Sequence, residues 1–336
     1  MAHLSDKTLK VGVAGMGKMG LLHCGILNVL PGVELAGVCE PVQLTRRILK
    51  KVLRKVPVVE DVSEMSRLDL DALFITTPTR THYAVAKTVL EGDIARNLFV
   101  EKPLSSSYAE SSDLCDLIGR KGVGMVGYVR RFMVTFMKAK EFLEQGAIGQ
   151  PRSFSVKMCS SDFFDIHDPA VSIARGGVLK DIGCYPIDLI HWYFGEFNID
   201  SASTESLTGP GAVDTVRFKV RGNGSVPSGE VFVSWCAEGY RMPEMEFSIF
   251  GSRGSLLVND DYVRLDVDEK VSTLYRLNLD DNNVAFMLGG PEYYREDECF
   301  VRTIEQQLIG LPSFDSAAKV EFVIEEVEKK ATKHEY

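Results

Sequence analysis

The chain has 336 residues, of which 45% are hydrophobic and 25% charged, and its formal net charge is −9. This length exceeds what one hydrophobic core usually serves, so we expect two domains. The acidic balance argues against nucleic acid as the main partner, and no apolar run reaches the roughly 18 residues that span a membrane.

The first part of the chain alternates strand-like and helix-like segments. Short apolar runs predict strands at Lys10–Ala14, Val33–Cys39, Asp71–Thr76, Asn97–Val100 and Val123–Val126. Helical periodicity predicts helices at Leu21–Leu30, Leu44–Leu53, Tyr83–Leu90 and Ser106–Ile118. This alternation predicts a parallel, doubly wound sheet covered on both faces, and we assign it to residues 1–127.

The pattern changes after Gly127. Helices are expected at Phe132–Gln145 and in the apolar stretch Gly177–Phe194, with a strand at Pro151–Met158 between them. Further strands, separated by turn residues, are predicted at Thr215–Val220, Glu230–Trp235, Met245–Ile249, Gly254–Val258, Tyr262–Val267 and Val271–Leu277. Two helices, Tyr293–Leu308 and Ser316–Lys330, are expected to close the chain. Residues 128–336 therefore predict an α+β domain with an open-faced, largely antiparallel sheet, beside the α/β domain that precedes it.

The cysteines and the N-terminus bear on the cellular compartment. Seven cysteines are scattered along the chain, and no two of them form a C-x-x-C pair. Met1–Lys10 lacks the apolar core of a signal peptide. We therefore expect reduced thiols and a cytoplasmic protein.

A glycine-rich turn follows the first predicted strand, in the run Gly15-Met16-Gly17-Lys18-Met19-Gly20. It matches G-x-G-x-x-G, and a helical pattern follows it. In such a turn the first glycine permits the tight bend, the second lets the backbone approach a pyrophosphate, and the third allows close helix–strand packing. Glu40 ends the next strand, where a carboxylate accepts hydrogen bonds from a ribose diol. These features predict a Rossmann domain that binds a dinucleotide.

Glu40 favours NAD over NADP, because its carboxylate would repel a 2′-phosphate. Arg46 and Arg47 are the opposing evidence, since either could reach such a phosphate and make NADP the cofactor. The alternative reading of this basic segment is a solvated helix face. Its apolar residues would then form one buried stripe and leave the basic side chains outward: Leu44, Ile48, Leu49, Val52 and Leu53.

Four motifs carry a family resemblance. Thr76-Thr77-Pro78-Thr79-Arg80-Thr81-His82 follows one predicted strand, and Glu101-Lys102-Pro103 follows the next. The other two are Gly127–Phe132 and Gly176–Asp188. Together they resemble the glucose–fructose oxidoreductase / inositol dehydrogenase / MocA-like family over nearly the whole chain.

The resemblance implies site residues as well as a fold. It implies that Lys102 lies near the nicotinamide and the reacting substrate carbon. It further implies that the cofactor is lined by Thr77, Pro78, Thr79, His82 and Glu101. Both loops leave the carboxyl ends of parallel strands, where open α/β sheets bind their ligands.

Oxidation of a secondary alcohol by hydride transfer also requires a base for the hydroxyl proton. Where the family commonly has histidine, this chain has Tyr185, and Asp181 lies four residues before it. A free phenol has a pKa near about 10, so a nearby cation would have to favour the phenolate. Our hypothesis is that Tyr185 exchanges the proton while Lys102 tunes it, and that Asp181 holds a sugar hydroxyl or Lys102.

Two more charged residues are candidates for substrate contact. By resemblance, Arg130 and Asp188 touch substrate hydroxyls, and structural salt bridging is an equally good reading of each. No group of His, Cys and Asp residues has the spacing of zinc ligands, so we expect no metal.

The sequence thus predicts an NAD- or NADP-dependent oxidoreductase that acts on a sugar, cyclitol or nucleotide sugar. A non-catalytic NAD-binding regulator of the same fold is the main alternative, and a methyltransferase that binds S-adenosylmethionine in the glycine turn is another. The open sheet should bury its second face against another subunit, giving a homodimer or homotetramer.

Overall fold

The computed structural model describes residues 8–119, 122–164, 170, 175–209, 213–224, 226–306 and 312–335. Residues 1–7, most of the segment used for the expectation about the N-terminus, lie outside these ranges. The chain divides into two compact units. The first comprises Met1–Val129 with Asn283–Glu321, and the second comprises Arg130–Asn282 with Phe322–Tyr336. Each unit is described by itself.

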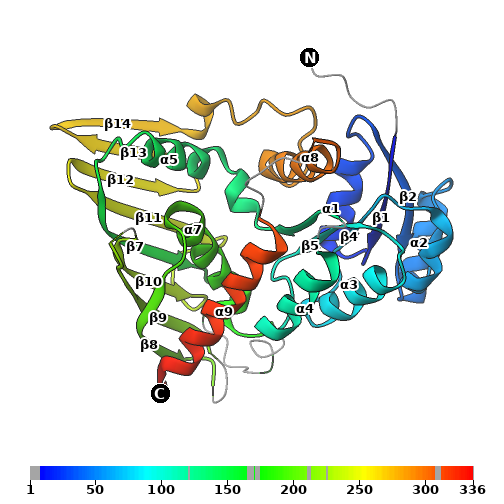
Figure 1. Cartoon of the computed structure of the whole chain (residues 1–336), viewed down its shortest axis with the longest axis horizontal. Helices are drawn as coiled ribbons and strands as arrows, with labels where there is room; N and C mark the ends of the chain where they lie inside the picture. The colour runs from blue at the N-terminus through cyan, green and yellow to red at the C-terminus, as the bar shows by residue number, and fades with distance from the viewer. Residues whose placement is uncertain are drawn as a thin grey trace. The chain divides into compact units, whose positions relative to one another are not determined.

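A six-stranded, fully parallel sheet forms the centre of the first unit (Figure 1). Its strand order is β3-β2-β1-β4-β5-β6, with bounds Leu9–Ala14 (β1), Val33–Cys39 (β2), Val58–Val59 (β3), Ala72–Ile75 (β4), Asn97–Glu101 (β5) and Gly124–Gly127 (β6). The order reverses at β1, so β1 and β4 flank the point where doubly wound sheets bind ligands. This confirms the predicted Rossmann architecture.

Helices cover both faces of this sheet. They are Lys18–Leu27 (α1), Gln43–Val52 (α2), His82–Glu91 (α3), Tyr108–Ile118 (α4) and Pro291–Gln306 (α8), with 3₁₀ turns at Val62–Leu68 and Thr79–Thr81. Helices α1 and α8 pack together on one face, and α3 and α4 pack together on the other (Figure 1). The central strands are buried on both sides, which explains their continuous apolar sequences.

Helix α2 corrects one prediction. Of the five residues of the expected buried stripe, only Leu49 is buried, whereas Leu44, Ile48 and Val52 are 69%, 55% and 71% exposed. The helix contacts the sheet along a narrow strip, so an amphipathic pattern does not identify the buried face here. Arg46, predicted to point outward, has a side chain that is only 12% exposed.

The second unit is built on a nine-stranded sheet of order β14-β13-β12-β11-β7-β10-β9-β8-β15. The strands are Pro151–Cys159 (β7), Asn198–Ser206 (β8), Thr215–Arg221 (β9), Ser228–Ser234 (β10), Glu244–Gly251 (β11), Gly254–Asn259 (β12), Tyr262–Val267 (β13), Lys270–Tyr275 (β14) and Ala331–Glu335 (β15). All neighbours are antiparallel except β7 with β10 and β8 with β15. The expectation of a largely antiparallel sheet is confirmed.

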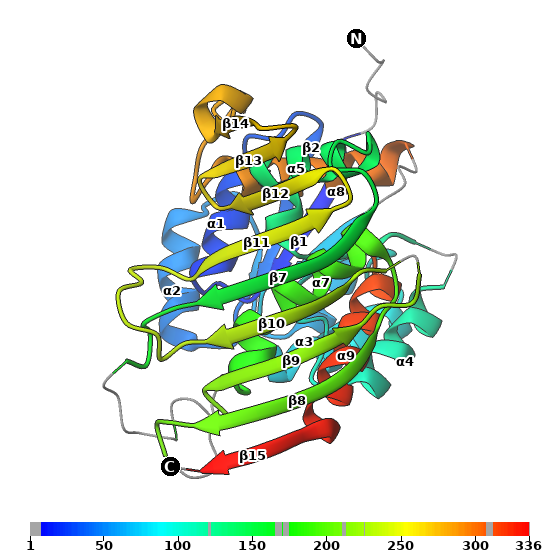
Figure 2. The same ribbon diagram turned by 90° about the vertical axis from the view of Figure 1, so that its left-hand side faces the viewer.

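One face of this sheet is covered within its own unit. Helices α5 (Val134–Glu144) and α7 (Cys184–Phe194) lie behind the strands in Figure 2. Buried and exposed residues alternate along β9, as a half-covered sheet requires. The described chain also contains 3₁₀ turns at Val129–Phe132 and Arg276–Leu279, and helix α9 spans Phe314–Lys330.

Several predicted boundaries differ from the structure. The expected helix Gly177–Phe194 begins with a π-helical turn, Leu179–Gly183, before α7 starts at Cys184. The strand expected to reach Leu277 ends at Tyr275. Residues 307–311, which include the predicted end of the helix at Leu308, lie outside the described ranges. Within those ranges, no helix combines the length and apolar character needed to cross a membrane.

Candidate active site

The glycine-rich turn joins β1 to α1 in the first unit. Gly15 has φ +92°, in the left-handed region that favours glycine, so the tight bend requires it. A Cβ on Gly20 would lie 1.9 Å from the carbonyl oxygen of Gly15, so the close approach of α1 to the turn requires glycine at this position. By contrast, a Cβ on Gly17 would meet no atom within 4 Å, so the space above it is open.

Helix α1 begins at Lys18 and presents a free N-terminus to that open space. Gly17, its N-cap, supplies no side-chain hydrogen bond, and the first turn contains no acidic residue. Helix N-terminal N–H groups without partners, together with the positive end of the helix dipole, favour a phosphate group. Met16, Lys18 and Met19 are therefore placed where the sequence predicts cofactor contacts.

Glu40 lies beside this turn and is 7% exposed. Its Oε2 accepts a hydrogen bond from the backbone N–H of Met16 at 3.0 Å, and its Oε1 accepts one from Val42 at 2.8 Å. Each carboxylate oxygen has a second lone pair, so Glu40 can still accept hydrogen bonds from a ribose diol. The two backbone bonds fix the carboxylate next to the turn.

Arg46 is held by groups of the protein. Its Nη1 donates to the carbonyl oxygens of Glu40 at 2.8 Å and Pro41 at 2.9 Å, and its Nη2 bonds to Glu60 at 2.6 Å. A guanidinium with these bonds is less available to a 2′-phosphate. The arrangement favours NAD, as the carboxylate of Glu40 does.

The two signature loops follow β4 and β5 and are joined by His82. This buried imidazole places Nε2 2.7 Å from the carbonyl oxygen of Thr77 and Nδ1 2.8 Å from that of Pro103, and the ring nitrogen that carries the proton donates to its carbonyl. Burial lowers the pKa of His82 and outweighs the opposing hydrogen bonds. The role of His82 in the described structure is to connect the loops.

Thr77 carries a buried hydroxyl oxygen with no hydrogen-bond partner within the described residues. Next to it, Thr76 donates from Oγ1 to the carbonyl oxygen of Gly15 at 2.7 Å and so ties the end of β4 to the glycine turn. An orphaned hydroxyl beside the turn fits a bound ligand that supplies the missing partner.

The Glu-Lys-Pro loop begins at the last residue of β5. The Oε2 of Glu101 accepts the backbone N–H of Lys102 at 3.1 Å, and its Oε1 bonds to Nε2 of His23 at 3.0 Å. His23 in turn contacts Asp297 of α8, which is 274 residues away in the chain. No local spacing in the sequence links α1 to α8, so the sequence alone offers no partner for His23.

In the second unit, Asp181 lies in the π-helical turn and Tyr185 in the first turn of α7. Between Asp181 and Ile190 these are the two residues that are not buried. Asp181 pairs with Nη1 of Arg175 at 3.3 Å, and Arg175 also bonds to Asp162 at 2.7 Å. The aspartate and the phenol thus share the accessible side of this segment, as their spacing predicts.

Arg130 and Asp188 are both buried and each makes an ion pair, the second of the two roles considered for them. Arg130 bonds through Nη2 to Asp260 at 3.1 Å, and its guanidinium lies 5.1 Å from the centre of the Tyr185 ring. Asp188, 1% exposed, receives two hydrogen bonds from Arg131 at 2.5 and 2.8 Å. Burial raises the pKa of Asp188 against the opposing charge of Arg131.

The structure therefore brings together one part of the predicted site. The glycine turn, Glu40 and the two signature loops follow the carboxyl ends of β1, β2, β4 and β5 in the first unit. Lys102 belongs to this unit, whereas Asp181 and Tyr185 belong to the second. The hypothesis that Lys102 tunes Tyr185 stays a prediction.

Known proteins resemble both units. Residues 9–128 match an oxidoreductase family with an NAD-binding Rossmann fold, and residues 136–257 match the GFO/IDH/MocA C-terminal domain. An uncharacterized oxidoreductase of Bacillus subtilis, YrbE, is 29% identical over 196 residues, which cover 56% of this chain and 54% of that protein. The myo-inositol 2-dehydrogenase of Thermotoga maritima is 25% identical over 266 residues, 75% of each chain.

Among solved structures, levoglucosan dehydrogenase in complex with NADH has a TM-score of 0.81 at 21% identity. That comparison covers 96% of this chain and 98% of the other, and it shows a shared fold. The sequence match to YrbE, in contrast, spans only about half of that protein's length.

Proposed function

We propose a dehydrogenase activity from one premise: the chain belongs to the GFO/IDH/MocA family of oxidoreductases. The proposed reaction transfers a hydride between NAD and the hydroxyl- or carbonyl-bearing carbon of a sugar, a cyclitol or a nucleotide sugar. Relatives named as myo-inositol 2-dehydrogenase and levoglucosan dehydrogenase act, by those names, on hydroxylated rings, which supports this substrate class.

The cofactor end of the site carries the proposal. Gly17 has open space above it, the N-terminus of α1 lacks a side-chain cap, and Thr77 has an orphaned hydroxyl. Glu40 ends the neighbouring strand with lone pairs that remain for a ribose. These features fit NAD: phosphates at the helix N-terminus, the adenosine ribose at Glu40, and polar groups of the ligand at Thr77.

We propose the following roles for this chain's residues. Bound NAD⁺ supplies the hydride acceptor. In its phenolate form, favoured by the charge of Lys102, the oxygen of Tyr185 takes the hydroxyl proton of the substrate as the carbonyl double bond forms, and the resulting phenol returns the proton in the opposite direction. Lys102 orients the reacting group, and Asp181 holds a neighbouring hydroxyl. Arg130 fixes the Tyr185 ring through their cation–π contact and is a weaker candidate for direct substrate contact.

The activity can be tested with the purified protein, NAD or NADP, and a panel of myo-inositol, scyllo-inositol, levoglucosan, glucose and nucleotide sugars. We expect the absorbance of the reduced nicotinamide to increase with at least one compound when NAD is the cofactor, rather than when NADP is. Tyr185→Phe should then lower turnover about 100-fold or more. Tyr193→Phe, on the same helix, removes one hydrogen bond to the carbonyl of Phe136 and is the matched control.

The outcomes separate the alternatives. Tight NADH binding without turnover of any compound would favour the non-catalytic regulator. Stabilisation by S-adenosylmethionine but not by NADH, in a thermal shift, would favour a methyltransferase. If Tyr185 and Lys102 act in the same step, the fold-loss of turnover in the double variant Tyr185→Phe with Lys102→Met will be smaller than the product of the fold-losses in the two single variants.

We also propose a homodimer or homotetramer formed through the open face of the nine-stranded sheet. Phe250 on β11 is 49% exposed, and the guanidinium of Arg217 covers the ring of Phe232 at 4.0 Å. Such apolar surface on a sheet favours burial against a second copy. Light scattering should detect the oligomer, and Phe250→Glu should dissociate it.

Seven free cysteines support a cytoplasmic location, which fractionation of source cells can test.

A further inference from the structure

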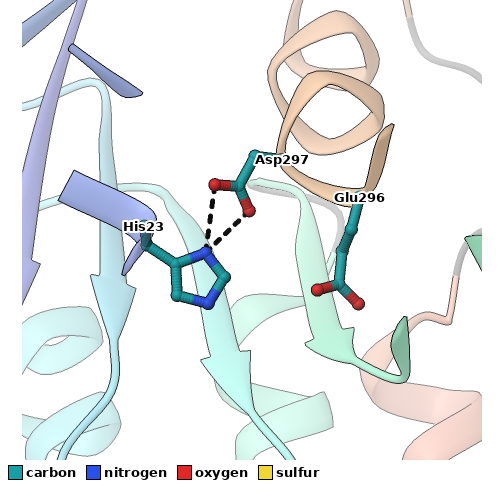
Figure 3. Close-up of side chains that lie close together, drawn as sticks. All are labelled: His23, Glu296 and Asp297. Atoms are coloured by element: carbon teal, nitrogen blue, oxygen red, sulfur yellow. Dashed lines mark hydrogen bonds and ion pairs between the residues drawn. The ribbon is translucent and has the colours of Figure 1, made fainter. Parts of the chain in front are cut away.

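Four ionisable side chains lie together inside the first unit, and only one of them belongs to the site described above. His23 comes from α1, Glu101 from the end of β5, and Glu296 and Asp297 from α8. Figure 3 shows His23 facing Asp297, with Glu296 beside them. The side chains of His23 and Asp297 are completely buried. A cluster of this kind needs compensating hydrogen bonds to be tolerated.

Both nitrogens of His23 face carboxylates. Nδ1 lies 2.8 and 3.0 Å from the two oxygens of Asp297, and Nε2 lies 3.0 Å from Oε1 of Glu101. Burial raises the pKa of Asp297, and its pair with His23 opposes this effect. With both carboxylates ionised they only accept hydrogen bonds, so each nitrogen donates and the ring is an imidazolium. Burial lowers the pKa of His23, but Asp297 and Glu101 together raise it well above its ordinary value.

Glu101 continues the chain of bonds to the signature loop. Its second oxygen, Oε2, accepts the backbone N–H of Lys102 at 3.1 Å. Burial raises the pKa of Glu101, but the hydrogen bond and charge of His23 outweigh this effect and leave the pKa lowered, so the carboxylate stays ionised. Both of its oxygens are thus fixed, one by α1 and one by the backbone of the loop.

We propose that His23 is a positioning residue that acts through Glu101. Held by Asp297, its imidazolium fixes the Glu101 carboxylate, and the carboxylate fixes the backbone of Lys102. The position of the Lys102 backbone, from which its side chain leaves, therefore depends on α8, a helix far away in sequence. This inference rests on the proposed function, in which Lys102 orients the reacting group. A misplacement of about 1 Å can cost about 100-fold in rate.

A metal ion is the competing reading of the same cluster. Ligand atoms of His23, Glu296 and Asp297 lie within 4.8 Å of one another, and both oxygens of Glu296 are buried without a hydrogen-bond partner in the described structure. However, Nδ1 of His23 already bonds to Asp297 and Nε2 already bonds to Glu101. Burial raises the pKa of Glu296 well above its ordinary value, which favours a neutral carboxyl over a metal-ligating carboxylate.

The test uses two full-length variants and one control. Asp297→Asn removes the charge that holds Nδ1, and His23→Gln keeps one donor for Glu101 but loses the imidazolium. Asp113→Asn is the matched control: its carboxylate bonds to Tyr83 at 2.9 Å and Lys87 at 3.0 Å in the same unit, outside the cluster. If neither variant folds, the double variant His23→Leu with Asp297→Leu replaces the buried pair by apolar groups.

The first readout is hydrogen–deuterium exchange of the Lys102 amide, measured by mass spectrometry with NAD⁺ bound. Release of Glu101 should speed this exchange about 10-fold or more, while the amides of β5 exchange as in the wild type. The second readout is turnover of myo-inositol with NAD⁺. We expect kcat to fall about 10-fold or more with the KM for NAD⁺ changed less than about threefold. The control should change neither readout.

The two readouts keep this inference separate from the proposed function. If the wild type oxidises no compound of the panel, the proposed function fails, yet the exchange rate at Lys102 still decides whether His23 positions that backbone. Unchanged exchange at Lys102 in well-folded variants would overturn the inference. So would one equivalent of a divalent metal in the purified protein, lost on Asp297→Asn, because the cluster would then be a metal site.

Discussion

Gly17 and Gly20, the second and third glycines of the dinucleotide turn, should respond differently to a single added methyl group. In Gly17→Ala the new Cβ meets no atom within 4 Å, and φ is −73°. Lower entropy of the unfolded chain stabilises such a variant by about 0.4–1 kcal/mol, and alanine is a poorer N-cap by a similar amount. The free energy of unfolding should therefore change by less than about 1 kcal/mol.

In Gly20→Ala the Cβ would lie 1.9 Å from the oxygen of Gly15 and 2.9 Å from Oγ1 of Thr76. These neighbours are the backbone of the turn and a side chain bonded to it, so the helix must move away from the strand. Overpacking of this kind costs about 1–3 kcal/mol, and we expect the upper end of that range.

NADH binding distinguishes the two variants further. The methyl group of Gly17→Ala fills the space through which a pyrophosphate would approach the helix N-terminus, so we expect at least a 10-fold rise in Kd, about 1.4 kcal/mol. Fluorescence titration measures the Kd, and denaturant unfolding without ligand measures the stability. Adenosine, which has no phosphate, should compete equally well in Gly17→Ala and the wild type. Wild-type affinity for NADH in Gly17→Ala would refute the assignment of the pyrophosphate to this turn.

Three further predictions concern charged groups. Asp188→Ala removes the carboxylate that accepts two hydrogen bonds from the buried guanidinium of Arg131 and should cost about 3–5 kcal/mol in denaturant unfolding, much of it recovered when Arg131→Met is added. An unchanged unfolding midpoint would contradict the buried pair. The folded-state pKa of His23 is raised above its ordinary value of 6.5, so its stabilising contribution should be complete below about pH 6.5 and lost as pH rises through the folded pKa. Denaturant unfolding of the wild type and His23→Gln across pH measures this contribution as the difference between their free energies of unfolding. A difference that grows as pH rises would contradict the prediction. Glu40→Ala should reduce the preference for NADH over NADPH, measured as the ratio of their Kd values, about 10-fold or more, because the repulsion of a 2′-phosphate is removed. An unaltered ratio would show that Glu40 does not select the cofactor.

The parts of the fold that the sequence predicts well are those with a strong local cause. Lys10–Ala14 and Asn97–Val100 are short apolar runs that fit strands buried on both faces, and each lies within one residue of the observed bounds at either end. The glycine turn is a local device too, since the bend at Gly15 and the close approach at Gly20 depend on residues within and beside the motif.

Other features depend on distant segments. The exposure of Leu44 and Val52 depends on how much of α2 the rest of the first unit covers, and helical periodicity carries no information about that. The strand Ala331–Glu335 forms because β8 offers it a parallel edge, and the sequence pattern predicts no element after Lys330. The partners of His23 come from β5 and α8, so no motif around His23 could predict them.

The return of residues 283–321 to the first unit has a consequence for synthesis of the protein. When the ribosome has made the six parallel strands, α8 does not yet exist, and the imidazole of His23 has no Asp297 to bind. Translation of residues 130–321 takes roughly 10 to 40 s at ordinary rates. During that interval the nascent N-terminal region has an uncovered apolar face and an incomplete charge cluster. A fragment that ends at Val129 would keep this state permanently, so chaperone capture and aggregation should be properties of the fragment rather than of the full chain.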